Sequence, residues 1–183
     1  MAEAIKVYHQ RGKDDWESPD DVFRPLNEEF EFTLDVCADV YNRKCERFFS
    51  KEKDGLSQIW APEVCWMNPP YSEWAKWVEK AYKEAALGAT VVALLPARTD
   101  TKAFHEWIYN EPTVEIRFVK GRVKFVGAEN GAPFPSMIVV FNPHPQGDPK
   151  PIEDDIFITK PLIARFDVKD WNEMQNDTLW LDG

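Results

Sequence analysis

The stretch Val64-Cys65-Trp66-Met67-Asn68-Pro69-Pro70-Tyr71 decides the fold, because it joins a short apolar run to a stiff turn that a helix-like segment follows. Consecutive prolines have a fixed φ and no N–H group, so the turn is rigid and its carbonyl groups are left as acceptors. Asn68 adds a side-chain acceptor before the turn, and Tyr71 adds a flat π-surface after it. These groups form a receptor for a flat heterocycle that carries an exocyclic amine.

In this receptor the ring stacks on Tyr71, while the Asn68 side-chain oxygen and the Pro69 carbonyl accept the two amine hydrogens. The tetrapeptide Asn68-Pro69-Pro70-Tyr71 resembles the catalytic motif of the S-adenosylmethionine-dependent amino-methyltransferases. That motif serves enzymes that modify the exocyclic amine of adenine, of cytosine or of a glutamine side chain. The alternative interpretation is a proline-rich turn that merely ends a strand.

Length and composition indicate one folded domain with a sizeable core. The chain has 183 residues, of which 44% are hydrophobic and 14% aromatic. We expect a cytoplasmic protein without a membrane partner, because no apolar run has membrane-spanning length and the first residues do not resemble a signal peptide. The cysteines Cys37, Cys45 and Cys65 are odd in number and lack metal-ligand spacing, so neither a disulfide framework nor a metal site is expected.

The net charge of −10 argues against a protein that coats nucleic acid by bulk electrostatics, but it leaves room for a local basic groove. Two stretches stand out from the acidic background. Residues 117–124 carry four cations and no acid, and residues 43–53 carry five cations against two acids. Each stretch is equally well explained as a solvated strand or loop edge.

Alternating strand-like and helix-like segments predict an α/β fold with a mostly parallel central sheet. Strands are expected at 30–36, 45–49, 64–67, 90–95, 114–119, 122–126 and 136–141. Helices are expected after an N-cap at Ser18 with Pro19 in the first position, at 73–87 and at 102–109. We assign residues 1–142 to a single Rossmann-like methyltransferase domain. Residues 143–183, acidic and with five prolines, are expected to form a tail or a small appendage outside the sheet.

A methyl donor needs space at the carboxyl end of the first strand, a carboxylate for hydroxyl or amine groups, and apolar walls. The segment from Asp35 to Asp39 offers small residues and two carboxylates there. The glycine-rich F-x-G-x-G signature is absent from this segment. No glycine-rich strand end follows Asn68, so the cofactor half is expected before the proline motif.

A series of motifs along the chain resembles the phage-type DNA N6-adenine methyltransferases, the small Dam-like enzymes of bacteriophages and prophages. The resemblance runs from about Trp16 to Phe141. Its motifs are Trp16-x-Ser18-Pro19, Asp35-x-x-Ala38, Asp54-Gly55-Leu56, Trp60, Asn68 to Ser72, Leu95-Pro96-Ala97-x-Thr99-Asp100-Thr101, Gly121-Arg122-x-x-Phe125 and Phe134-Pro135-Ser136.

The resemblance implies S-adenosylmethionine as the cofactor, DNA as the partner, and a role for each matching residue. The cofactor contacts that it implies are Trp16, Ser18 and Pro19 at the methionine end, Asp35, Cys37 and Ala38 as the floor, and Asp54 at the ribose or the cofactor amine. Asp54 is also explained as the first residue of an Asp-Gly turn. The implied DNA contacts are Arg98, Lys120, Arg122 and Lys124.

The expected reaction is methyl transfer to the adenine N6 amine, with Asn68, Pro69, Pro70 and Tyr71 as the catalytic turn. Adenine inside a duplex cannot be reached, so the target must be flipped out or single-stranded. RNA and protein glutamine remain alternative substrates because the proline motif is shared. A non-catalytic, acidic DNA-mimic relative is the alternative outside the enzymes.

Overall fold

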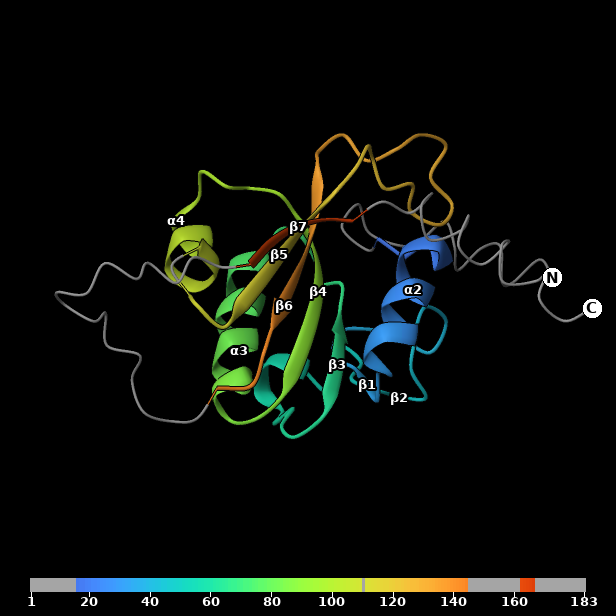
Figure 1. Ribbon diagram of the computed structural model, residues 1–183. Coiled ribbons are helices and arrows are strands. Elements are labelled where there is room, and N and C mark those ends of the chain that lie inside the picture. Colours follow the sequence, from blue (N-terminus) through green and yellow to red (C-terminus); the bar gives the residue numbers. More distant parts are fainter. Residues whose placement is uncertain (1–15, 110, 145–161, 167–183) are drawn as a thin grey trace, which may run out of the picture.

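The computed structural model describes residues 16–109, 111–144 and 162–166, and these form a sheet with helices on both faces (Figure 1). Along the chain the elements are α2 (Asp20–Phe30), β1 (Leu34–Asp35), β2 (Arg47–Phe48), the 3₁₀ turn η1 (Gly55–Ser57), β3 (Val64–Met67), α3 (Trp74–Ala86), β4 (Thr90–Pro96), α4 (Lys102–Phe104), the π-helical turn η2 (His105–Tyr109), β5 (Val114–Val119), β6 (Ser136–Phe141) and β7 (Leu162–Phe166).

The sheet has the order β2-β1-β3-β4-β6-β5-β7. The pairings β2–β1, β1–β3, β3–β4 and β5–β7 are parallel, whereas β6 pairs antiparallel with both β4 and β5. The α/β class is therefore confirmed, with a mixed sheet. Because β1, β3 and β4 are parallel, their carboxyl ends at Asp35, Met67 and Pro96 face the same edge. Ser136 pairs with Pro96, so the loop before β6 also reaches this edge.

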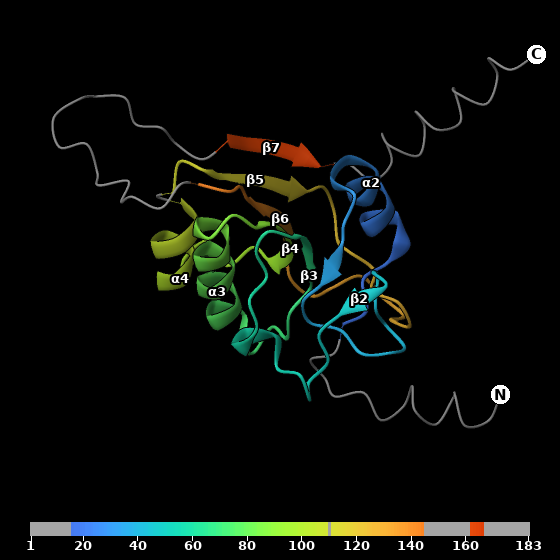
Figure 2. The ribbon, with the colours of Figure 1, turned by 90° about the horizontal axis from the view of Figure 1, so that it is seen from below.

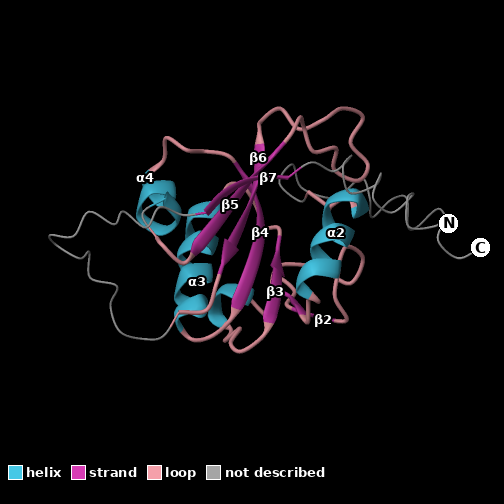
Figure 3. Cartoon of the chain, viewed as in Figure 1, coloured by secondary structure: helices cyan, strands magenta, loops and turns pink. Residues whose placement is uncertain are grey.

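The helices lie on opposite faces of the sheet, with α3 and α4 on one side and α2 on the other (Figures 2 and 3). Every residue of β4 after Thr90 is buried, as expected for a strand covered on both faces. On the α3 face, Trp74, Trp77 and Val78 join the core with residues of β3 and β4. On the α2 face, Val22 and Leu26 pack with Trp66.

Three local predictions are wrong at their boundaries. Helix α2 begins at Asp20, with Pro19 as its N-cap and no side-chain capping bond, so Ser18 is not the cap. The helix continues to Phe30, and a left-handed Glu31 ends it, so β1 is shorter than the expected 30–36 strand. The expected helix 102–109 contains only a short α-helical segment, followed by the π-helical turn.

Two further differences concern the sheet. Residues 122–126 do not form a strand, because their alternation places Val123 and Phe125 in the α2-side core from within a loop. Strand β7, which lies in the expected tail, pairs with β5 and so extends the sheet. Most of the expected tail, and the residues before Trp16, lie outside the described residues. Among the helices that the structure describes, none has the length and apolar character needed to span a membrane.

Candidate active site

A cavity of about 340 Å³ opens at the carboxyl edge of the sheet, and it brings together six of the eleven predicted catalytic and cofactor-binding residues. Predicted residues in its wall are Trp16, Cys37, Ala38, Asp54, Asn68 and Pro70. A small adjoining recess, which shares Asn68 and Trp16 with it, is lined also by Ser18 and Asp35. The segment at Trp16, the loop after β1 and the proline turn after β3 thus line one site. They meet there because β1 and β3 are parallel neighbours whose carboxyl ends lie side by side.

The side-chain amide of Asn68 is held at both ends. Its Nδ2 donates a hydrogen bond to the Trp16 carbonyl, and its Oδ1 accepts one from the Tyr71 hydroxyl at 3.2 Å. A carbonyl oxygen can only accept, so the contact with Trp16 determines which end of the amide is the nitrogen. The Oδ1 atom has a second lone pair that can serve a ligand.

The carbonyl groups of the turn differ in their backbone hydrogen bonds. The Pro70 carbonyl accepts the N–H of Glu73 at 3.1 Å and so begins the turn into α3. No backbone N–H group of the described residues donates to the Pro69 carbonyl. Arg98 Nη1 donates to the Tyr71 carbonyl at 3.2 Å, which ties the end of β4 to the turn. Asn68 Oδ1 and the Pro69 carbonyl are thus two acceptor groups of the turn, and of these two residues Asn68 lines the cavity.

Tyr71 lies at the turn, but its ring is buried and only 2% exposed. Phe125 and Phe134, from the loop between β5 and β6, contact it edge-on at ring-centroid distances of 6.1 and 5.3 Å. The sequence motif predicts an aromatic ring at the turn, whereas the tertiary packing determines how much of the ring is exposed to a ligand. In this conformation the Tyr71 face is covered.

Asp35 supports the cavity from beneath. Its carboxylate is 3% exposed and accepts the backbone N–H groups of Cys37 and Lys44 at 3.3 and 3.0 Å, so it fixes both ends of the loop after β1. Desolvation by burial raises the pKa of this carboxyl group to about 6, although the two N–H groups act in the opposite direction. Burial also raises the pKa of the Cys37 thiol, which therefore remains neutral.

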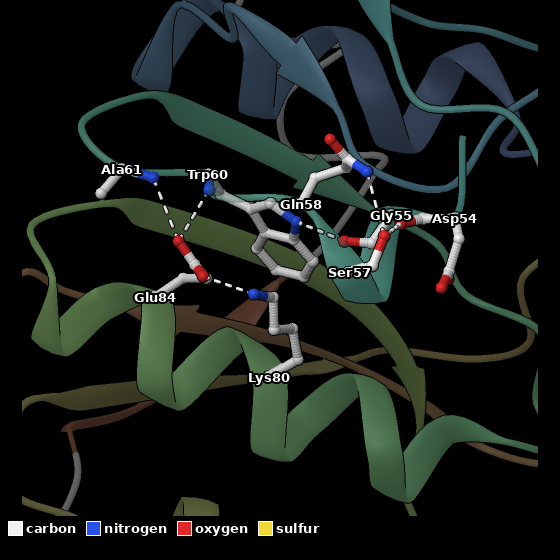
Figure 4. A network of polar contacts seen from close by, with 8 residues as sticks. All are labelled: Asp54, Gly55, Ser57, Gln58, Trp60, Ala61, Lys80 and Glu84. Carbon is white, nitrogen blue, oxygen red and sulfur yellow. Dashed lines mark hydrogen bonds and ion pairs between the residues drawn. The ribbon is translucent and has the colours of Figure 1, made fainter.

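The wall formed by η1 rests on a buried polar network (Figure 4). The Glu84 carboxylate, 2% exposed, accepts the backbone N–H groups of Trp60 and Ala61 at 2.7 and 3.1 Å and pairs with Lys80. Trp60 Nε1 then donates to the Gly55 carbonyl at 2.8 Å. The helix α3 thereby positions the segment that places Asp54 and Gly55 at the cavity.

Sequence reasoning missed several wall residues. Asn42 is one of them, and its Oδ1 accepts the N–H of Asp39, which belongs to the predicted segment, at 2.6 Å. Val36 and Leu56 also lie in predicted segments. The other missed wall residues are Phe49, Ser50, Lys51, Glu52, Glu73 and Trp77. Glu73 was detectable because it follows the proline motif directly, whereas the others carry no motif of their own. Pro19 was expected at the cofactor, but it lies in neither wall and is instead the N-cap of α2.

The predicted DNA-contacting cations lie on exposed positions. Lys120, Arg122 and Lys124 follow β5, and the last two make no ion pair within the described residues. Arg117 of the same stretch is instead engaged by Glu29, at 2.6 Å for each of two bonds.

In the other basic stretch, Lys44 pairs with Asp20 at 2.9 Å and Arg47 with Glu63 at 2.6 Å. These pairs involve two of the five cations of that stretch. No cluster of metal-ligating side chains occurs among the residues that the structure describes.

Comparison with known proteins identifies the family. The family model described as DNA N-6-adenine-methyltransferase (Dam) matches residues 7–160. A protein of Haemophilus phage HP1 (strain HP1c1) named DNA N-6-adenine-methyltransferase is 34% identical over 139 residues, which cover 72% of this chain and 80% of that protein. A protein of the same name from Escherichia phage T1 is 31% identical over 134 residues, which cover 65% of this chain and 56% of that protein.

Proposed function

This chain belongs to the Dam family of DNA N-6-adenine-methyltransferases, and we propose that its cavity binds S-adenosylmethionine and its proline turn binds the target adenine. The chain is therefore an enzyme of adenine-N6 methylation in DNA. The membership favours DNA over the RNA and glutamine alternatives. It also supports the proposals that the mixed sheet belongs to a Rossmann-like fold and that the protein acts in the cytoplasm of a bacterial host.

The wall of the cavity suits the proposed cofactor in size and in chemistry. Its volume of about 340 Å³ lies in the range of small-molecule sites. Apolar surface from Val36, Leu56 and Trp77 suits a nucleobase, and the carboxylates of Glu52 and Asp54 suit hydroxyl or amine groups. When bound, S-adenosylmethionine supplies an electrophilic methyl group on a sulfonium.

The observation that carries the proposal is the pair of acceptors at the turn. Asn68 lines the cavity, its Oδ1 retains a lone pair, and the neighbouring Pro69 carbonyl accepts no backbone N–H group of the described residues. Two acceptors on one exocyclic amine draw its hydrogens out of the ring plane and localise its lone pair. Because these groups are held before the reaction, positioning and electrostatics supply the rate enhancement without a strong base.

The target adenine would be flipped out or single-stranded, as access to a base in a duplex requires. Stacking of the base on Tyr71 remains part of the proposal, and it requires the half-buried Phe134 to move away from the ring. The cations Lys120, Arg122 and Lys124 are proposed to contact phosphates.

Incubation with methyl-labelled S-adenosylmethionine and unmethylated DNA tests the function, with nucleoside analysis as the readout. The wild-type protein should produce N6-methyladenine. The Asn68→Ala variant should bind the cofactor but form no product, because Asn68 acts on the target amine. Absence of labelled N6-methyladenine from the wild type, or label in cytosine alone, would overturn the proposal.

A further inference from the structure

The loop formed by residues 120–135, which joins β5 to β6, places two aromatic rings around the proline turn. Phe125 is 2% exposed and Phe134 is half-buried. The Trp16 ring lies 5.1 Å from Phe125 and 6.4 Å from Phe134. The Tyr71 ring lies 6.1 and 5.3 Å from the same two rings. Each phenylalanine therefore contacts both Trp16 and Tyr71.

Trp16 and Tyr71 are also the two residues that hydrogen-bond the Asn68 amide. The loop fixes the Trp16 segment a second time, through the backbone, because the Val126 N–H donates to the Glu17 carbonyl at 3.1 Å. Both hydrogen-bond partners of Asn68 are thus supported by one loop. Among the described residues, the hydrogen bonds of the Asn68 amide go to Trp16 and Tyr71, and neither belongs to this loop.

We propose that the 120–135 loop is a positioning element for Asn68, and that Phe125 is its principal positioning residue. The inference rests on the proposed function, in which Asn68 Oδ1 accepts the target amine. Rotation of the amide by half a turn would present an N–H donor to that amine, which offers donors of its own. The Trp16 carbonyl prevents this rotation only while Phe125 and Val126 keep the Trp16 segment in place.

The same loop carries Arg122 and Lys124, on either side of the buried Val123. The surface proposed to meet DNA and the support of the catalytic amide therefore belong to one continuous segment. Under this proposal, contact of the 120–135 loop with DNA and the orientation of the Asn68 amide are coupled through the backbone of the loop.

Phe125→Leu tests the role, with Phe104→Leu as the matched control. Phe104 is a buried phenylalanine of the α3-side core, and its ring contacts among the described residues are with His105 and Tyr109. Phe125→Leu should lower kcat for methyl transfer at least tenfold, with the Kd of S-adenosylmethionine changed less than threefold. Phe104→Leu should leave kcat within twofold. If Phe125→Leu does not fold, Phe134→Leu removes a contact with the Trp16 ring at a less buried position.

A second readout follows the amide itself. The side-chain NH₂ signals of Asn68 can be assigned by NMR through their loss in Asn68→Asp. Phe125→Leu should increase their exchange with water and move them toward the shifts of a free asparagine, whereas Phe104→Leu should not.

Unchanged Asn68 signals in Phe125→Leu, or an equal fall of kcat in both leucine variants, would overturn the positioning role. A wild-type protein without methylation activity would count against the proposed function instead, since the NMR signals would still report whether the Asn68 amide is held in one orientation.

Discussion

At the scale of single residues, Asp35 shows how one buried carboxylate can organise a ligand site without touching the reaction. It fixes the backbone at Cys37 and Lys44, and through them the loop that lines the cavity. Burial raises the pKa of its carboxyl group from 3.8 to about 6. The folded protein therefore holds this proton more tightly than the unfolded chain does.

The raised pKa predicts a stability change of definite sign. Because the folded state binds the proton more tightly, the contribution of Asp35 to the free energy of unfolding falls as the pH rises from about 4 through about 6. Asp35→Asn cannot ionise, so the wild type should lose up to about 3 kcal/mol relative to this variant across that window. Urea unfolding of both proteins at a series of pH values measures the difference, and a difference independent of pH would contradict it.

At the scale of elements, the turn η1 depends on a residue without a side chain. A Cβ atom at Gly55 would lie 2.1 Å from the Val36 carbonyl oxygen and 3.1 Å from Cη2 of Trp77. The backbone oxygen cannot move without displacing the strand-end segment that lines the cavity. The close packing of η1 on the end of β1 thus accounts for the glycine.

Gly55→Ala should lower the free energy of unfolding by about 1–3 kcal/mol, because the extra methyl group forces the backbone apart. It should also weaken binding of S-adenosylmethionine, since both displaced segments lie in the wall of the cavity. Denaturant titration and calorimetry measure the two effects. Ile59→Ala is the matched control, since Ile59 is 74% exposed and should change neither quantity much.

The loop after β5 permits a second prediction at this scale. If Lys120, Arg122 and Lys124 contact phosphates, each change to Ala should weaken DNA binding equally for all sequences. It should also reduce the slope of log affinity against log salt by about one unit. Lys83→Ala removes the same charge from α3, where Lys83 pairs with Glu79, and should leave the slope unchanged. Unchanged slopes in all three loop variants would place the DNA surface elsewhere.

At the scale of the whole molecule, sequence patterns predicted what depends on neighbouring residues along the chain. The buried run of β4 and the rigid turn at Asn68 were both readable, because periodicity and proline chemistry are local. The support of Trp60 by Glu84 was not, since a charged residue on a helix gives no sign that it will be buried. Phe125 was mistaken for part of a strand because a loop that packs alternate residues has the same pattern.

Strand β7 gives a prediction for the complete fold. Because it pairs with β5 over residues 115–119, removal of residues 143–183 would leave the backbone groups of that edge unpaired. The shortened protein should unfold at a lower temperature and self-associate, as thermal denaturation and light scattering would measure. A shortened chain that remains monomeric with an unchanged Tm would show that β7 adds little to the sheet.

The reversed direction of β6 has a consequence for how such a protein can diversify. Since β5 and β6 are antiparallel neighbours whose last pair is Phe118 and Met137, the segment between them leaves and re-enters the sheet at adjacent points. Doubling the length of such an insertion adds only about 0.6 kcal/mol of closure entropy, so its tip can be lengthened or grafted without disturbing the strands. The segment is therefore open to engineering, provided that each graft keeps aromatic rings equivalent to Phe125 and Phe134.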